Sequence, residues 1–340
     1  VTATYILLKG FKRLGANVDT YIPDRIADGY GIHDHLIQQA KDDGINLIVT
    51  CDNGISAAEQ ITFANSLGMT VVVTDHHEIP FEDTEDGRIY KLPPAAAIIN
   101  PKQPSCAYPS KNICGAVVAM KLVFALYERY GVPENEKEDY LEPAAIATVG
   151  DIMDLQGENR ILVKEGLARL SHTKNKGLKA LIRAIGLEDQ KISSYDIGFR
   201  LGPCINASGR LDTAMRSLAL LQCEDEEEAA RLANDLKALN DSRKALTELG
   251  TEAAYKLIEG SELKNDRVMV VFLPECHESL AGIIAGRIRE KYHKPAFVLT
   301  RGENSVKGSG RSIECYSMYE ELVKCDSLLI QYGGHPMAAG

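Results

Sequence analysis

Several features common in proteins are missing from this 340-residue sequence, and each absence narrows the possible functions. No run of about 18 apolar residues occurs, so a membrane span is not predicted. The eight cysteines are scattered without a C-x-x-C pair, which argues against a structural zinc site and favours reduced thiols in a cytoplasmic protein. Positive charge is also scarce: the formal net charge is −10, which is untypical of a generic phosphate-backbone binder but leaves room for a local basic groove.

The most informative stretch is the one in which an apolar strand gives way abruptly to polar side chains. A run of β-branched residues from Val71 to Thr74 predicts a buried strand. It is followed directly by four polar residues, Asp75, His76, His77 and Glu78. Open parallel sheets bind ligands beyond the carboxyl ends of their strands, and Asp and His are residue types that bind metals there. The alternative interpretation is an ordinary polar strand end with satisfied histidines.

Two further acidic turns follow apolar runs. The predicted strand 46–51 leads into Asp52-Asn53-Gly54-Ile55, and the apolar run 144–149 leads into Gly150 and Asp151. Because neighbouring parallel strands end at the same edge of a sheet, Asp52, Asp75 and His76 are expected at one rim. Three acidic turns, one of them with a His pair, are typical of a two-metal site. Asp154 suits a helix N-cap or a solvated carboxylate as well as a ligand.

Together these motifs resemble the DHH phosphoesterase family. The similarity rests on Asp-His-His at 75–77, Asp-Asn-Gly-Ile at 52–55 and Gly-Asp-Ile-Met-Asp at 150–154. The Gly-Gly-His segment at 333–340 is similar to the accompanying DHHA1 domain. Segments 199–211 and 276–285 are similar to the bacterial RecJ family of single-strand-specific exonucleases. The order and spacing of the five motifs extend the resemblance over essentially the whole chain.

The resemblance implies a metal-dependent 5′→3′ exonuclease that hydrolyses phosphodiester bonds of single-stranded DNA in repair and recombination. By the resemblance, Asp52 bridges two Mn²⁺ or Mg²⁺ ions, and His76 and Asp151 complete the coordination of one of them. Asp75 is expected to orient His76, and His77 is expected to face the scissile phosphate. Mixed carboxylate and imidazole ligands suit these metals better than metals that prefer thiolates.

The two ends of the sequence also carry expectations from the resemblance. In the family, a strand ending in Asp-x-Asp-x-Asp-Gly precedes a segment that residues 1–5 resemble. The sequence is therefore interpreted as a fragment that begins after this first motif and ends before a C-terminal portion. Its 340 residues alone are not expected to hold the full set of metal ligands.

Residues that bind phosphate are expected in the second half of the chain. Arg210 follows a small-residue stretch at 206–209 that is interpreted as a turn, and Arg311 follows Ser309 and Gly310 in a similar Gly-flanked segment. Backbone N–H groups and a guanidinium in such turns can bind a phosphate. With the resemblance added, the expected substrate-binding residues are Asn206, Arg210, His277, Ser309, Arg311 and His335. A metal-ligand role for the pair Cys276 and His277 is a less favoured alternative.

Base stacking has few candidate residues. Tryptophan is absent and aromatic residues make up 6% of the sequence, so no strong platform for stacked bases is visible. The candidates are Tyr108, Phe199 and Tyr332.

The predicted fold class is α/β, with two α/β domains joined by a long helix. Residues 1–200 form the DHH domain, with a parallel sheet built from alternating strands and helices. Its predicted strands are 17–22, 46–51, 70–74 and a short one at 96–99 in an irregular stretch. Its predicted helices are 2–14, 33–43, 56–67, 116–130 and 140–148, followed by short helices over 156–200.

The rest of the chain is expected to hold the substrate. Residues 201–259 contain the phosphate-binding segment and a connecting helix over 224–258, either unbroken or broken near Asn240. Residues 260–340 form the DHHA1 domain. Its predicted strands are 268–273 and 296–300, and its predicted helices are 280–292, 317–324 and one that starts after His335.

Two alternative functions remain open at this point. One is a DHH–DHHA1 phosphodiesterase that acts on short oligonucleotides or cyclic dinucleotides, and the other is a non-catalytic DHH-fold scaffold. The presence of Asp52, His76, His77 and Asp151 argues against the scaffold. The expected partner is single-stranded DNA, with a single-strand-binding protein or a helicase as candidate protein partners. A monomer away from any membrane is expected.

Overall fold

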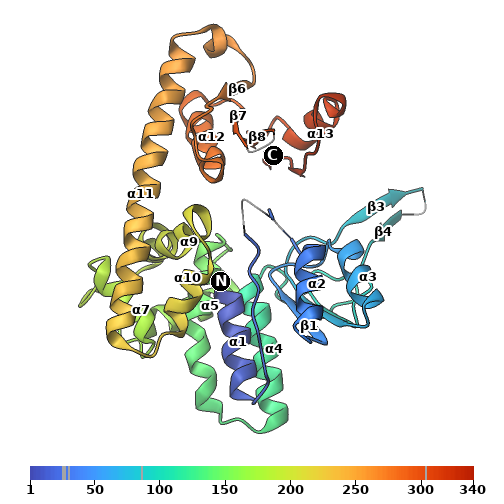
Figure 1. The fold of residues 1–340 in the computed structure, drawn as a ribbon, viewed down its shortest axis with the longest axis vertical. Coiled ribbons are helices and arrows are strands. Elements are labelled where there is room, and N and C mark those ends of the chain that lie inside the picture. The colour runs from blue at the N-terminus through green and yellow to red at the C-terminus, as the bar shows by residue number, and fades with distance from the viewer. Residues whose placement is uncertain (25–27, 30, 86, 303–304) are drawn as a thin grey trace. The chain divides into compact units, whose positions relative to one another are not determined.

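The computed structural model describes residues 1–24, 28–29, 31–85, 87–302 and 305–340. Within it the chain divides into two compact units, Val1–Lys237 and Ala238–Gly340. Each has its own hydrophobic core and is described separately (Figure 1). The predicted boundaries after residues 200 and 259 stay a prediction. None of the helices in the described residues is long and apolar enough to span a bilayer.

The first unit is built around a parallel sheet. Its strands are β1 (Leu47–Cys51), β2 (Thr70–Thr74) and β5 (Ala97–Ile99), in the order β1-β2-β5. Cys51 pairs with Thr74, and Thr74 pairs with Ile99, so the three carboxyl ends lie at one edge. The polar residues that follow β1 and β2 therefore emerge side by side, as their sequence pattern predicts.

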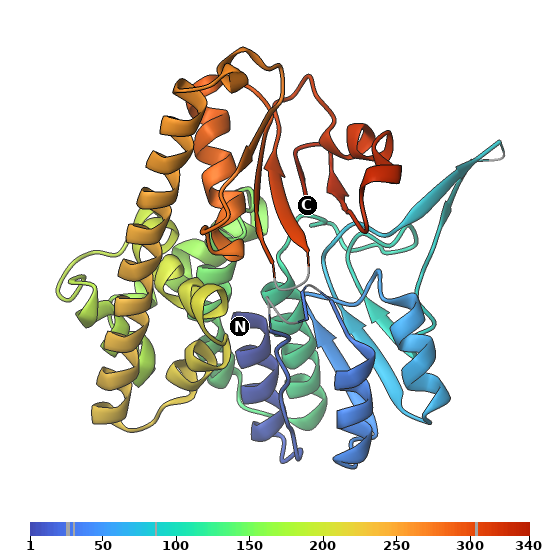
Figure 2. The ribbon, with the colours of Figure 1, turned by 45° about the horizontal axis from the view of Figure 1, so that its top comes forward.

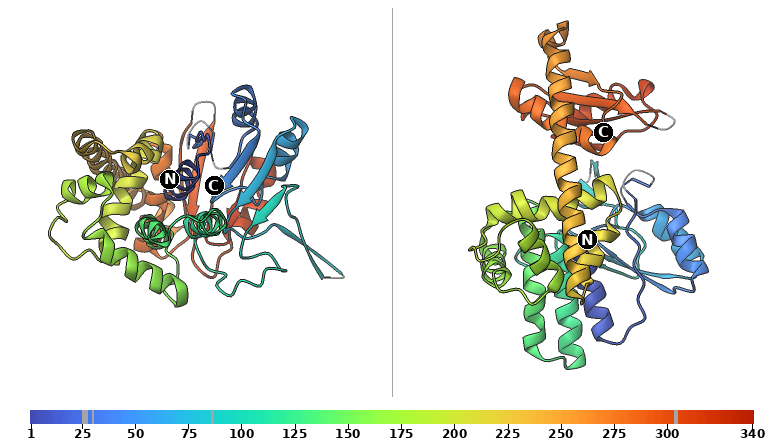
Figure 3. Two further views of the ribbon diagram at one scale, coloured as in Figure 1. Left: turned by 90° about the horizontal axis from the view of Figure 1, so that it is seen from below. Right: turned by 60° about the vertical axis from the view of Figure 1, so that its left-hand side comes forward.

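Helices cover both faces of this sheet. On one face, α2 (Asp34–Asp42) and α3 (Ala58–Ser66) bury their apolar residues against Val71 and Val73. On the other face, α1 (Thr2–Arg13), α4 (Gly115–Tyr130) and α5 (Leu141–Gly150) pack around Val49 and Ile99 (Figure 3). The alternation of side chains along each strand sends successive residues to opposite faces, so one short strand contributes to both cores.

Helical segments complete the first unit. They are η1 (Glu134–Tyr140), α6 (Gly157–Leu170), α7 (Lys176–Ala184), α8 (Ser194–Asp196), η2 (Ile197–Leu201), α9 (Gly202–Leu211) and α10 (Met215–Gln222). The segment η2 is a π-helical turn between α8 and α9. Helix α11 (Glu226–Glu259) then runs without a break across the boundary between the units, so the predicted long helix is confirmed in its unbroken form (Figure 3).

The second unit contains a mixed five-stranded sheet. Its strands are β6 (Met269–Phe272), β7 (Ala296–Arg301), β8 (Val306–Arg311), β9 (Gly334–His335) and β10 (Ala338–Ala339), in the order β6-β7-β8-β10-β9. Only the β6–β7 pair is parallel among the strands of the described chain in this unit. Helix α12 (Glu278–Tyr292) packs Leu280, Ile284 and Ile288 against the sheet. Helix α13 (Met318–Val323) and the short turns η3 (Glu262–Asn265) and η4 (Asp326–Leu328) complete the unit.

Three predicted local structures are wrong in the first unit. Residues 17–22 are not a strand, because no strand of the described chain pairs with them. The irregular stretch after residue 80 contains an exposed hairpin, β3 (Phe81–Thr84) and β4 (Gly87–Tyr90), which extends away from the sheet (Figure 2). The small-residue segment at 206–209 is not a turn but part of helix α9.

Two predicted local structures are wrong in the second unit. The segment from Ser309 to Arg311 belongs to strand β8, so its glycines do not form a turn. The residues after His335 form strand β10 and not the start of a helix, because they pair with β8 and β9.

Candidate metal centre and phosphate site

Asp52 lies in the turn that follows β1. Its N–H donates to the Thr74 carbonyl at 2.9 Å, so the residue is fixed to the neighbouring strand β2. Its φ is +59°, a conformation that Asp adopts more readily than most residues. Gly115, the first residue of α4, faces the Asp52 carboxylate so closely that a Cβ there would collide with it. The turn and the glycine together fix where this carboxylate points.

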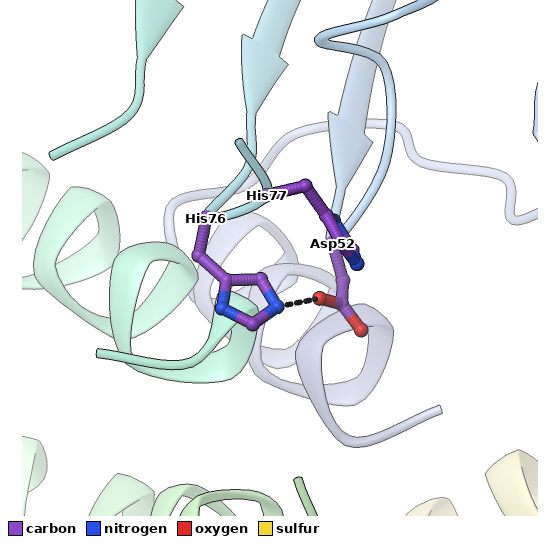
Figure 4. A group of neighbouring side chains, drawn as sticks. All are labelled: Asp52, His76 and His77. Atoms are coloured by element: carbon purple, nitrogen blue, oxygen red, sulfur yellow. Dashed lines mark ion pairs between the residues drawn. The ribbon is translucent and has the colours of Figure 1, made fainter. Parts of the chain in front are cut away.

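His76 lies directly against Asp52. Its Nε2 atom is 3.0 Å from Asp52 Oδ1, and the imidazole is largely buried (Figure 4). Asp52, His76 and His77 each offer one ligand atom, and these atoms all lie within 4.8 Å of one another. Two ligands at right angles around an ion with bonds of about 2.1 Å stand about 3 Å apart. The Asp52–His76 spacing therefore fits one divalent ion bound by both.

Asp75 organises the turn behind the two histidines. The residue is 1% exposed. Its Oδ1 accepts the backbone N–H groups of His76 at 2.8 Å and His77 at 3.2 Å, and lies 2.7 Å from His77 Nδ1. Its Oδ2 accepts the N–H of Ile55 at 3.0 Å. The side chain that Asp75 orients is thus that of His77, whereas it holds His76 through the backbone, which corrects the expectation that it orients the His76 ring.

The pKa values of His77 and Asp75 shift in opposite directions. The hydrogen bond that the His77 ring donates to the Asp75 carboxylate outweighs the effect of burial and raises the pKa of His77. Burial by itself favours the neutral form of Asp75, but the hydrogen bonds from His77 and Ile55 outweigh it and lower the pKa of this carboxyl. The ring of His77 is half-exposed, so its Nε2 is accessible from solvent while Nδ1 is held by Asp75.

Asp151, at the end of α5, is near enough for its carboxyl to feel the charges of Asp52, His76 and His77, but it is not among the three described residues whose ligand atoms lie within 4.8 Å of one another. It caps the carboxyl end of that helix, next to Ile152 in the left-handed conformation. The pKa of Asp151 is raised, first by desolvation of the carboxyl and then by the Asp52 charge, whereas His76 and His77 act to lower it. The residue as a whole is nevertheless exposed. Asp154 is exposed and is not the N-cap of α6, which is Gln156.

In the second unit, several predicted phosphate-binding residues gather at the amino end of α12. His277 is the N-cap residue, and its Nδ1 lies 2.8 Å from the Ser279 hydroxyl. Arg311 contacts Ser309 at 3.3 Å, and a Cβ at Gly282 of α12 would lie 2.7 Å from the Arg311 guanidinium and 2.8 Å from the Ser309 hydroxyl. The amino end of a helix favours anions, so this cluster has the chemistry of a phosphate site.

His335 belongs to the same side of the second sheet as Arg311. Arg311 pairs with Ala338, and Ala338 pairs with His335. Residues directly opposite one another on neighbouring strands share a face, so His335 and Arg311 lie in one row across β10. The remaining predicted substrate residues, Asn206 and Arg210, lie on α9 in the first unit, where Asn206 is exposed.

Comparisons with known proteins identify two domain families in this chain. Residues 1–148 match the DHH family, N-terminal domain, and residues 265–340 match the DHHA1 domain. A solved structure described as exonuclease RecJ bound to manganese superposes with a TM-score of 0.85 at 34% identity, covering 99% of this chain and 81% of the other. The chain belongs to the RecJ family.

Other RecJ proteins match the whole chain as well. The single-stranded-DNA-specific exonucleases RecJ of Bacillus subtilis (strain 168) and Escherichia coli (strain K12) are 37% and 38% identical over 100% of this chain. The chain spans 42% and 60% of the length of these two relatives. The solved RecJ of Thermus thermophilus in complex with Mg²⁺ is 31% identical, with a TM-score of 0.73, covering 100% of this chain and 44% of the other.

The structure also brings forward residues that the sequence did not indicate. Gly115 has no recognisable motif, and its role against Asp52 depends on how α4 meets the end of β1. Gly282 lies in the RecJ-like segment 276–285, but only the folded sheet shows that it faces Arg311. Cys276 and His277 do not form a metal-binding group in the described part of the chain. No local sequence signal could have distinguished these glycines from others.

Proposed function

We propose that the protein to which this chain belongs carries out metal-dependent 5′→3′ exonucleolytic hydrolysis of single-stranded DNA, in DNA repair and recombination. The observation that carries the proposal is the clustering of Asp52, His76 and His77 at the carboxyl ends of adjacent strands in a RecJ-family chain. Relatives at 37% and 38% identity are named single-stranded-DNA-specific exonucleases, and a solved relative is bound to manganese.

In this proposal the first unit holds two Mn²⁺ or Mg²⁺ ions. Asp52, His76 and Asp151 would provide ligands for them, and the 3.0 Å spacing of Asp52 Oδ1 and His76 Nε2 suits two ligands of one ion. When bound, the ions supply an activated water and neutralise charge on the phosphate oxygens. A nearby cation would stabilise the ionised form of Asp151, which desolvation and the Asp52 charge disfavour.

His77 is proposed to contact the scissile phosphate. Asp75 holds its Nδ1, which fixes the orientation of the ring and leaves Nε2 for the substrate. The hydrogen bond to Asp75 raises the pKa of His77 and so favours the protonated ring. A protonated imidazole donates a charge-assisted hydrogen bond to a phosphate oxygen, which is stronger than a bond between neutral groups. Asp75 therefore acts through His77 and not on the substrate.

The second unit is proposed to bind the phosphates of the strand. His277, Ser309, Arg311 and His335 surround the amino end of α12 or lie on the same side of its sheet. Asn206 and Arg210, on α9 of the first unit, are proposed separately as substrate-binding residues. We propose single-stranded DNA as the partner, a single-strand-binding protein or a helicase as protein partners, a monomeric state and a cytoplasmic location. The eight cysteines form no disulfide in the described chain, which supports a reducing compartment.

The test measures the hydrolysis of different substrates by the full-length gene product. We expect release of nucleotides from a long 5′-phosphorylated single strand in Mn²⁺, none with a chelator, and slow release from a duplex. Asp52→Ala should lower the rate by more than about a hundredfold through loss of a metal ligand. Asp19→Ala, which removes an exposed carboxylate elsewhere, is the matched control.

The same assay separates the alternatives. Rapid hydrolysis of a dinucleotide or cyclic dinucleotide with no attack on the long strand would replace the proposal by a short-substrate phosphodiesterase. Absence of hydrolysis of every substrate would favour a scaffold. An Asp52→Ala protein with full activity would refute the assignment of the metal centre.

A further inference from the structure

An exposed pair of aromatic rings lies in the first unit, on the segment formed by α8 and η2. The rings of Tyr195 and Phe199 are stacked, with centroids 4.6 Å apart and planes inclined by 27°. They are 64% and 65% exposed. Burial of an aromatic ring away from water is favourable in free energy, and an exposed ring lacks this stabilisation. An exposed stack is therefore a candidate for contact with another molecule. The sequence indicated Phe199 alone, and the structure adds Tyr195.

The segment that carries these rings is held firmly. Ile197 and Leu201 are fully buried on either side of Phe199. A capping box between Ser193 and Asp196 fixes the start of the segment. Arg200 donates to the Ile185 carbonyl at 2.7 Å. Because the backbone is already fixed, a ligand that stacks on the rings has little ordering cost to overcome.

The local geometry is also unusual. Phe199 lies in η2. Turns of π-helix are rare in proteins, and those that occur are often found at functional sites. Gly198 in the same turn faces α5, where a Cβ on it would lie 3.8 Å from Val149 Cγ1. Helix α5 ends at Gly150 and is followed directly by Asp151. The turn that carries Phe199 therefore packs, through Gly198, against the end of α5 that leads into the proposed metal ligand Asp151.

Two other aromatic residues in the described chain, Phe81 and Tyr108, already have a cation near their rings. Arg88 lies 3.5 Å from the centroid of the Phe81 ring on the exposed hairpin. The Tyr108 ring is partly buried, with the Lys121 ammonium 4.8 Å from its centroid and its hydroxyl bonded to Glu158. By contrast, within the described residues Tyr195 and Phe199 have no cation over their rings and stack on each other.

We propose that Tyr195 and Phe199 form a stacking platform for a base of the single strand close to the scissile phosphate. This inference rests on the proposed function. Every nucleobase has a flat π face, so stacking holds a strand without preference for sequence, as an exonuclease that passes along DNA requires. The platform positions substrate and takes no part in the chemistry at the metals.

The test measures binding without hydrolysis. Fluorescence anisotropy of labelled single strands is recorded with the full-length gene product in chelator. Phe199→Ala should weaken binding about five- to a hundredfold, the range for loss of one aromatic stacking contact, and Phe199→Tyr should restore it. The Phe199 side chain is exposed, so both Phe199 variants should keep the melting temperature of the parent protein. Tyr130→Ala is the control, since Tyr130 is 69% exposed at the far end of α4.

A scan with single abasic sites identifies the base involved. The parent protein should lose affinity when one particular base near the 5′ end is removed, and Phe199→Ala should lose no further affinity at that position. Equal losses in both proteins at every position, or unchanged binding by Phe199→Ala, would overturn the platform while leaving the exonuclease intact. A parent protein that neither binds nor cleaves single strands would overturn the proposed function and the platform together.

Discussion

Replacing Asp75 with Asn tests the turn that positions both histidines. Three donors meet at Oδ1 of Asp75, and the Ile55 N–H meets Oδ2. Asn has one acceptor oxygen and one NH₂ group, so whichever way it lies, a donor faces a donor in a buried site. Loss of one charge-assisted bond, together with a buried donor left unsatisfied, should cost about 2–4 kcal/mol of folding free energy.

Urea denaturation at pH 7, monitored in the first unit, measures this cost. Asp19→Asn removes the same charge at an exposed position and should change stability by no more than about 0.5 kcal/mol. Hydrolysis should also fall in Asp75→Asn, because His77 loses the partner of its Nδ1. An Asp75→Asn protein as stable as the control would refute the assigned hydrogen bonds.

The difference should depend on pH in a definite direction. The pKa of Asp75 is lower in the folded protein than in the unfolded chain, because the hydrogen bonds from His77 and Ile55 outweigh the effect of burial. The stability that it contributes is therefore fully present above the unfolded pKa of about 4 and is lost as the pH falls through the folded pKa. The gap between parent and Asp75→Asn should narrow below about pH 4. A gap that widens in acid would contradict the lowered pKa.

Three further changes test other parts of the structure. Gly115→Ala should weaken Mn²⁺ binding at least about tenfold in calorimetry, because a Cβ there displaces the Asp52 carboxylate, and unchanged affinity would show that the contact is unimportant. Arg311→Ala should weaken binding of 5′-phosphorylated strands by about 1.5–3 kcal/mol and lower their preference over 5′-hydroxyl strands, with exposed Arg183→Ala as the control; an unchanged ratio would make Arg311 a structural residue. Ile152→Gly should raise the free energy of unfolding by about 0.5–1 kcal/mol, because this 90% exposed, β-branched residue has φ +55°; a lower melting temperature would contradict this.

The sequence predicted the centre of the first unit well, because local pattern and tertiary structure agree there. The β-branched run from Val71 to Thr74 forms β2 with the predicted bounds, and the polar residues after it reach the edge of the sheet. The hairpin of β3 and β4 was missed, since all residues of its two strands are exposed and no alternating buried face marks them in the sequence. A short segment of this kind has the composition of a loop.

Small residues were the main source of error. The strand has a glycine at position 310 because Met318 and the Phe297 ring leave no room for a side chain. The chain does not turn there. In α9, Ser208 and Ala207 are fully buried, and the Ser208 hydroxyl lies 2.8 Å from that of Ser217 on α10. In both places a small residue allows close packing by a neighbouring element. Local sequence cannot distinguish this use of small residues from a turn.

The most direct test of the metal centre is crystallographic. Crystals of the full-length gene product are soaked in Mn²⁺, and anomalous difference density is measured at the manganese edge. We predict a peak within about 2.3 Å of both Asp52 Oδ1 and His76 Nε2, the two atoms that lie 3.0 Å apart in the structure. A peak that contacts neither atom, in crystals of protein that hydrolyses single strands in Mn²⁺, would contradict the proposed centre.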